Sequence, residues 1–137
     1  MTRTYQSRSF RLLTILLAVL FFGSGVSKMA AADAQVQDFS NWGYPMWFMY
    51  LTGFLEVVGG LLLALASTRF IGALALSCVM LGAVATHIAF GEYAMAILPT
   101  VLLGLLIWIA SASSRPVLLE SPAAQSRRQV EHHGHRV

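Results

Sequence analysis

A single carboxylate in the middle of a long apolar run is the feature that most constrains this chain. The run covers residues 44–66 and carries Glu56 near its centre. A helix needs about 20 apolar residues to cross a bilayer, at about 1.5 Å per residue. A carboxylate at the centre of such a helix costs about 2.5 to 3.5 kcal/mol on insertion scales. Glu56 must therefore face a partner on another helix, line a wet cavity or stay protonated.

The composition places the whole chain in the membrane class. Of its 137 residues, 57% are hydrophobic and 11% are charged, whereas about a quarter of the residues of a soluble domain are charged. This length allows about four spans and no separate soluble domain. The single cysteine, Cys78, excludes an internal disulfide, dithiol chemistry within one chain and a cysteine-built metal site. We expect no metal site.

Hydrophobicity predicts four membrane spans joined by short connections. The expected spans cover about residues 12–32, 45–66, 70–90 and 94–110. Short connections favour an all-α, antiparallel four-helix bundle. Residues 1–11 then form a basic N-terminal segment, and residues 111–137 a disordered basic tail. A second interpretation of the first apolar run is a secretory signal, because basic residues precede it and small residues follow it.

The distribution of charge predicts the orientation. The N-terminal segment, the turn at Arg69 and the tail hold eight of the nine basic residues. The connections on the other side carry the acids Asp33, Asp38 and Glu92 instead. By the positive-inside rule both termini are cytoplasmic, and the basic ends set topology rather than bind nucleic acid. The polar connection at residues 33–43 is expected to be the longest loop between spans.

Three polar residues of the spans fall in the same half of the membrane when depth is counted along each helix. They are Lys28, Glu56 and His87. We predict an ion pair between Lys28 and Glu56, direct or through water, because either charge is costly to leave unpaired in lipid. The alternatives are a snorkelling lysine and a glutamate that only makes a structural hydrogen bond between helices. His87 is either an interfacial histidine or a ligand-binding, proton-handling group near Glu56.

Structural roles are predicted for three further residues around Glu56. Gly53 and Gly60 share its helix face by their spacing and are expected to pack against another helix. Pro45 suits the first turn of the second span, where its missing N–H costs nothing.

Three segments carry a resemblance to a known family. They are FFGSGVSKM at residues 21–29, GYPMWFMYLTGFLEVVGGLLL at 43–63 and VMLGAVATHI at 79–88. Through them, residues 11–109 resemble the DoxX-like family of small four-helix bacterial membrane proteins. The resemblance implies an antiparallel bundle in the inner (plasma) membrane. It also implies that family motif positions are occupied by Lys28, Pro45, Gly53, Glu56, Gly60 and His87.

The resemblance leaves several functions open. Some relatives are linked to quinone-reducing or thiol-stress enzymes, and others act as assembly chaperones. The first hypothesis is an accessory subunit, not catalytic alone, whose Lys28, Glu56 and His87 bind a small hydrophobic ligand such as a quinone for a partner oxidoreductase. The second is a non-catalytic membrane scaffold or assembly chaperone whose buried charges only stabilise the bundle. A third, a solute or proton pathway, would need a homo-oligomer, because the chain is too short for two repeats.

Overall fold

The computed structural model describes residues 8–114, and this part of the chain contains helices and no strand. The helices are α1 (Arg8–Met29), α2 (Asp33–Asn41), α3 (Met46–Ala64), α4 (Arg69–Ala89) and α5 (Tyr93–Ser114). Four of them, α1, α3, α4 and α5, are long and apolar enough to cross a membrane. The predicted disordered tail, except for its first four residues, and the first seven residues of the predicted N-terminal segment lie outside the described residues.

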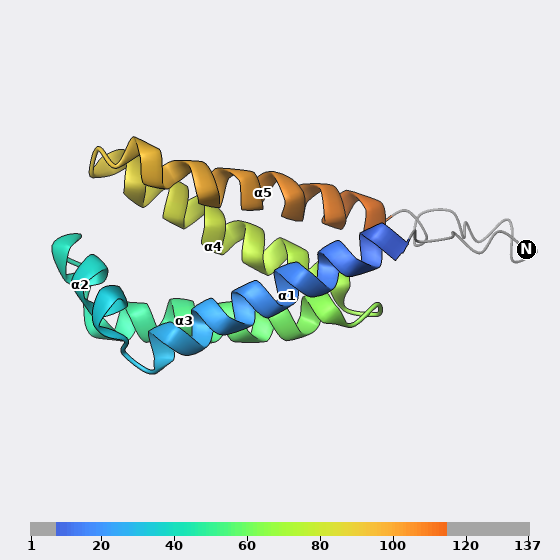
Figure 1. The fold of residues 1–137 in the computed structure, drawn as a ribbon, viewed down its shortest axis with the longest axis horizontal. Coiled ribbons are helices and arrows are strands. Elements are labelled where there is room, and N and C mark those ends of the chain that lie inside the picture. The colour runs from blue at the N-terminus through green and yellow to red at the C-terminus, as the bar shows by residue number, and fades with distance from the viewer. Residues whose placement is uncertain (1–7, 115–137) are drawn as a thin grey trace, which may run out of the picture.

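The four long helices lie along one axis in two pairs (Figure 1). Helix α1 packs on α3, α4 packs on α5, and α3 packs on α4 to join the pairs. The start of α1 and the end of α5 lie at the same end of the molecule, and α2 lies at the other. We refer to these as the Arg69 end and the α2 end.

Helix α2 corrects the prediction of a loop at residues 33–43. It forms because the segment has a buried apolar residue on one face, Phe39, with Val36 one turn before it and half-buried. Asp33 lies in its first turn, where a carboxylate stabilises the N-terminal end of a helix. The predicted loop is thus a short amphipathic helix across one end of the molecule.

The apolar core lies toward the Arg69 end. Its fully buried members come from all four long helices and include Phe21, Leu63, Leu76 and Leu106. On α1, α4 and α5 the buried core extends toward the α2 end only as far as Phe21, Met80 and Leu102. Beyond that level the buried apolar residues, such as Met49 and Ala96, lie outside this core cluster. The two pairs are therefore held together mainly at the Arg69 end.

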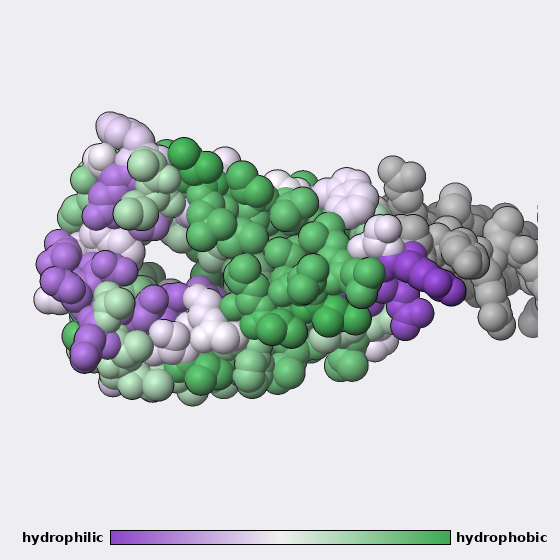
Figure 2. Space-filling model, viewed as in Figure 1, coloured by the Kyte–Doolittle hydropathy of each residue, from purple (hydrophilic) through white to green (hydrophobic). Residues whose placement is uncertain are grey.

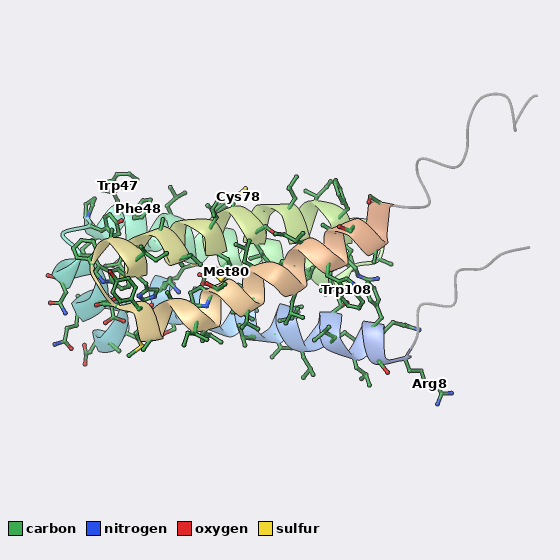
Figure 3. The ribbon with its side chains drawn as sticks, turned by 90° about the horizontal axis from the view of Figure 1, so that it is seen from above. Arg8, Trp47, Phe48, Cys78, Met80 and Trp108 are labelled. Atoms are coloured by element: carbon green, nitrogen blue, oxygen red, sulfur yellow. The ribbon has the colours of Figure 1, made fainter. Side chains whose placement is uncertain are left out.

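A buried arginine strengthens the Arg69 end. The Arg69 side chain donates from Nε to the carbonyl oxygen of Leu63 at 3.3 Å, and its guanidinium carbon lies 5.6 Å from the centroid of the Phe10 ring. Phe10 in turn makes an edge contact with Trp108, with ring centroids 5.4 Å apart. Trp108 and the pair Trp47 and Phe48 lie at opposite ends of the molecule (Figure 3). The Phe10–Trp108 contact thus ties α1 to α5 at the Arg69 end.

Glycines allow the helices of the first pair to touch backbone to backbone. A Cβ atom on Gly53 would lie 2.9 Å from the carbonyl oxygen of Gly25, and one on Gly60 would lie 2.9 Å from that of Ala18. Contacts this close are typical of membrane helices, whose association depends on van der Waals packing. The helix-packing face predicted around Gly53 and Gly60 is present, and α1 is what it packs against. Pro45 is the residue immediately before α3, in an extended conformation.

Candidate functional site

The ion pair predicted between Lys28 and Glu56 is present. The ammonium Nζ of Lys28 on α1 lies 3.0 Å from Oε2 of Glu56 on α3. Gly53 makes this possible, because it lies about one turn before Glu56 and a Cβ atom there would come within 2.8 Å of the Cβ of Lys28. The close backbone approach described above therefore brings the two charges together.

Both charges are removed from solvent. The side chain of Glu56 is 4% exposed and that of Lys28 is 12% exposed. Lys28 also donates from Nζ to the hydroxyl oxygen of Ser24 at 2.9 Å. In a low-dielectric interior such pairing offsets the cost of dehydrating each ion, and removing one partner leaves the other uncompensated. The unit formed by Ser24, Lys28 and Glu56 is close to electrically neutral.

This unit has bonding capacity left over. An ammonium has three N–H donors, and the described residues accept from two of them on Lys28. Within residues 8–114, Oε1 of Glu56 has no hydrogen-bond partner, and it is not among the fully enclosed polar atoms. One donor and one acceptor are therefore free to meet another molecule.

His87 belongs to a second polar group, on α4 and the turn that follows it. Its Nδ1 lies 2.8 Å from Oε2 of Glu92. The same carboxylate oxygen accepts a hydrogen bond from the indole Nε1–H of Trp42 at 3.2 Å. The rings of Trp42 and His87 meet edge to face, with centroids 5.2 Å apart. The carboxylate bonded to His87 is thus Glu92, whereas Glu56 pairs with Lys28.

A glycine turn positions Glu92. Gly91 has a φ of +73°, a left-handed conformation that costs glycine little. The N–H of Glu92 donates to the carbonyl oxygen of His87 at 2.8 Å, and that of Gly91 donates to Ile88 at 3.1 Å, which is the Schellman pattern of a helix end. The turn returns the chain so that the Glu92 side chain meets His87. A carboxylate only accepts, so Nδ1 of His87 carries a proton in this hydrogen bond, and Nε2 is an acceptor in the tautomer that has its single proton on Nδ1.

An aromatic group lies at the α2 end and contacts the second polar group through Trp42 and His87. Its rings are Phe39, Trp42, Tyr44 and Phe48, each within 5.1 to 6.3 Å of at least one other, centroid to centroid. We call it the aromatic cap. The hydroxyl groups of Tyr44 and Thr86 lie 3.0 Å apart and share a hydrogen bond. The cap therefore links the segment before α3 to α4.

A space separates the two helix pairs between the aromatic cap and the buried core. Figure 2 shows an opening near the α2 end, between the α1–α3 pair and the α4–α5 pair, with hydrophilic residues on its side toward α2 and hydrophobic residues on the opposite side. Its position matches the level beyond which the buried core ends on α1, α4 and α5. Lys28, Glu56 and His87 all lie on the α2 side of that core along their helices. We call this space the opening.

Sequence reasoning missed Ser24, Trp42 and Glu92 as members of these polar groups. A signal existed for Ser24, which is four residues before Lys28 and so shares its helix face. For Glu92 the signal was the Gly-Glu pair that follows His87 at the end of a span. Trp42 had no such local signal, because α2 brings it to Glu92 across 50 residues of sequence. The described residues contain no group of three or more His, Cys, Asp or Glu side chains that could hold a metal ion.

Comparison with known proteins assigns the family. The model of the DoxX-like family matches residues 12–110, so the chain belongs to that family. Among curated proteins of Bacillus subtilis, it is 32% identical over 86 residues to "Putative oxidoreductase CatD", covering 59% of this chain and 63% of CatD. It is 34% identical over 50 residues to the uncharacterized protein YdgD, covering 36% of this chain and 44% of YdgD. This chain therefore spans less than two thirds of either relative. No solved structure matches it.

Proposed function

We propose that this multi-pass membrane protein is an accessory, ligand-binding subunit of a membrane redox system linked to quinones. The observation that carries the proposal is the buried Lys28–Glu56 pair, which lies on the α2 side of the core. Among the described residues it leaves one N–H and one carboxylate oxygen without a partner. The name of the relative CatD supports a redox setting. The activity itself belongs to a partner oxidoreductase, because no cofactor ligand set is evident in the sequence.

The chemistry of a quinone suits the three proposed ligand-binding residues. Its carbonyl oxygens accept hydrogen bonds, and the free N–H of Lys28 can donate one. When the partner oxidoreductase takes the two electrons of the corresponding quinol, its two hydroxyl protons are released, and Nε2 of His87 can accept one of them while Glu92 holds Nδ1. Glu92 is 39% exposed and gives that proton a route to water.

The orientation we propose puts both termini in the cytoplasm and the α2 end outside. At the Arg69 end the described cations are Arg8, Arg11 and Arg69, whereas α2 and the turn after α4 carry Asp33, Asp38 and Glu92. This asymmetry follows the positive-inside rule for an antiparallel four-helix bundle in the plasma membrane. The site then lies in the outer half of the bilayer.

Lipid extraction with native mass spectrometry tests the proposed function. Wild type, Glu56→Gln and Cys78→Ser are purified in mild detergent and analysed for bound quinone and retained proteins. Cys78 is exposed on α4, so its variant controls for a span substitution away from the site. We expect quinone on wild type and Cys78→Ser and none on Glu56→Gln. Absence of quinone from all three overturns the proposal.

One observation favours the alternative of a scaffold or assembly chaperone. Lys28 and Glu56 neutralise each other at the glycine-packed α1–α3 contact, which is also what a purely structural lock requires. In that case Glu56→Gln would keep full cellular activity at normal protein level. A loss of activity in Glu56→Gln protein that accumulates normally would count against the scaffold.

A further inference from the structure

The sides of the opening differ in how they are held. The α3–α4 side is tied at the Arg69 end by the short turn between these helices and at the α2 end by the Tyr44–Thr86 hydrogen bond. The α1–α5 side is tied at the Arg69 end by the Phe10–Trp108 contact. Helix α1 packs chiefly on α3, and α5 packs chiefly on α4. The α1–α5 side is thus the less constrained one.

The α2 end of the opening is covered. Trp42 bonds to Glu92 and contacts His87, and Tyr44 bonds to Thr86, so the aromatic cap spans from α2 to α4. A molecule coming from water would have to separate these contacts. A molecule already dissolved in the bilayer meets the gap between α1 and α5 directly. The easier route to Lys28 and Glu56 runs sideways through the membrane.

We propose that the ligand enters from the bilayer between α1 and α5, as an amphiphile with an uncharged, hydrogen-bonding head and an apolar tail that stays in the lipid. The head reaches the Lys28–Glu56 pair, whose net charge is close to zero, so an uncharged head suits it better than a phosphate. This inference rests on the proposed function and adds the route and the shape of the ligand.

The Phe10–Trp108 contact shows which residues of α1 and α5 lie at the same level. Leu20 lies ten residues after Phe10, and Leu98 lies ten residues before Trp108. At about 1.5 Å per residue both are about 15 Å from that contact, and so at one level. Leu20 follows the buried Leu17 by three residues, and Leu98 precedes the buried Leu102 by four. Both side chains are exposed, and each lies at the edge of its core-facing side.

The variant Leu20→Trp with Leu98→Trp is designed to narrow the α1–α5 gap. Val19→Trp with Ile97→Trp is the matched control, because these exposed residues are one position away on the lipid-facing side. Leu20→Ala with Leu98→Ala is designed to widen the gap. It tests the same route without requiring the protein to accommodate larger side chains. Circular dichroism and gel filtration establish that each variant is folded.

The measurement is the association rate of radiolabelled decylubiquinone with the protein in nanodiscs. We expect a rate at least tenfold lower in the narrowed variant, within twofold of wild type in the control, and raised in the widened variant. A decylubiquinone with a bulky fluorophore at the far end of its tail should bind within threefold of the unlabelled affinity, because the tail lies outside the protein.

The outcomes separate the two proposals. Wild type that binds decylubiquinone while the narrowed and widened variants keep its rate overturns the α1–α5 route and points to the α3–α4 side or the cap. Loss of binding with the tail-labelled probe overturns the external tail. Wild type that binds no quinone, or retains phospholipid only, overturns the proposed function itself.

Discussion

Gly53 lies against Lys28 so closely that a Cβ atom on this glycine would come within 2.8 Å of the lysine Cβ. The ion pair between Lys28 and Glu56 thus depends on a residue that carries no side chain. The same missing atom lets the backbones of α1 and α3 meet at Gly25. Gly53 thus allows both the close packing of α1 on α3 and the ion pair between them.

The first prediction concerns this glycine. Gly53→Ala should lower the free energy of unfolding by about 1 to 3 kcal/mol, because the added methyl group forces α1 and α3 apart. Gly23→Ala is the control, since a Cβ atom there meets nothing within 4 Å. It should be neutral or stabilise by up to about 1 kcal/mol, as alanine favours a helix. Thermal unfolding in detergent measures both, and equal effects would contradict the prediction.

The second prediction concerns the ion pair. Lys28→Met or Glu56→Gln alone should cost about 3 kcal/mol, because each leaves its buried partner without its charge or its donor. The double variant should cost clearly less than the sum of the two, since no unpaired charge remains. Denaturant unfolding of all four proteins gives the coupling energy. If the loss of unfolding free energy in the double variant equals the sum of the two single losses, Lys28 and Glu56 do not interact in the folded protein.

A third prediction concerns the end of α1. Ala31 has a φ of +50° and occupies the left-handed position of a Schellman turn, in which Ala32 donates to the carbonyl oxygen of Ser27 at 3.1 Å. This conformation costs an alanine about 1 kcal/mol relative to glycine. Ala31→Gly should therefore stabilise the protein by up to about 1 kcal/mol. Ala30→Gly, at the preceding residue, should not, and a higher melting temperature for both would point to a non-local cause.

A fourth prediction concerns the carboxylate shared by His87 and Trp42. Glu92→Ala removes the acceptor of both hydrogen bonds and should cost about 1 kcal/mol, because this side chain is partly exposed. It should also shift the fluorescence of Trp42 to longer wavelength as the indole meets water. The measurement uses a background with Trp47→Phe and Trp108→Phe, in which Trp42 is the remaining tryptophan.

The control for this prediction is Asp38→Ala, which removes an exposed carboxylate from α2. Its emission and stability should match those of the background protein. Unchanged Trp42 emission in the Glu92 variant would show that the indole does not depend on this carboxylate.

The sequence was sufficient for the spans and for the Lys28–Glu56 pair, for one physical reason. Lipid offers no partner to a charge, so two charges at similar depth in neighbouring helices have few alternatives. It was not sufficient for His87, because depth along a helix places a residue at one end without saying which way it points. The partner of His87 is instead Glu92, which follows the reversal of the chain at Gly91.

Helix α2 escaped prediction for a related reason. Its polar composition matched a loop, and the apolar spacing of Val36 and Phe39 is too short a pattern to distinguish a helix from chance. It is held by contacts beyond the helix itself: Phe39 packs with Tyr44 and Phe48, and Trp42 at the end of the helix bonds to Glu92, 50 residues away. The opening likewise depends on where the buried core ends on several helices. The sequence of any one helix does not show this.

The two-pair arrangement leaves most of each span in contact with lipid. Only 22% to 33% of the residues in the most apolar window of each long helix are buried inside the protein. Many of the others are exposed on the outside of the helices, so a bilayer would supply much of the packing that a soluble four-helix protein makes internally. Within residues 8–114 the longest helices have 22 residues, about 33 Å. Acyl-chain length and order therefore act on this protein as further determinants of its stability, and its unfolding free energy is a joint property of the chain and the membrane.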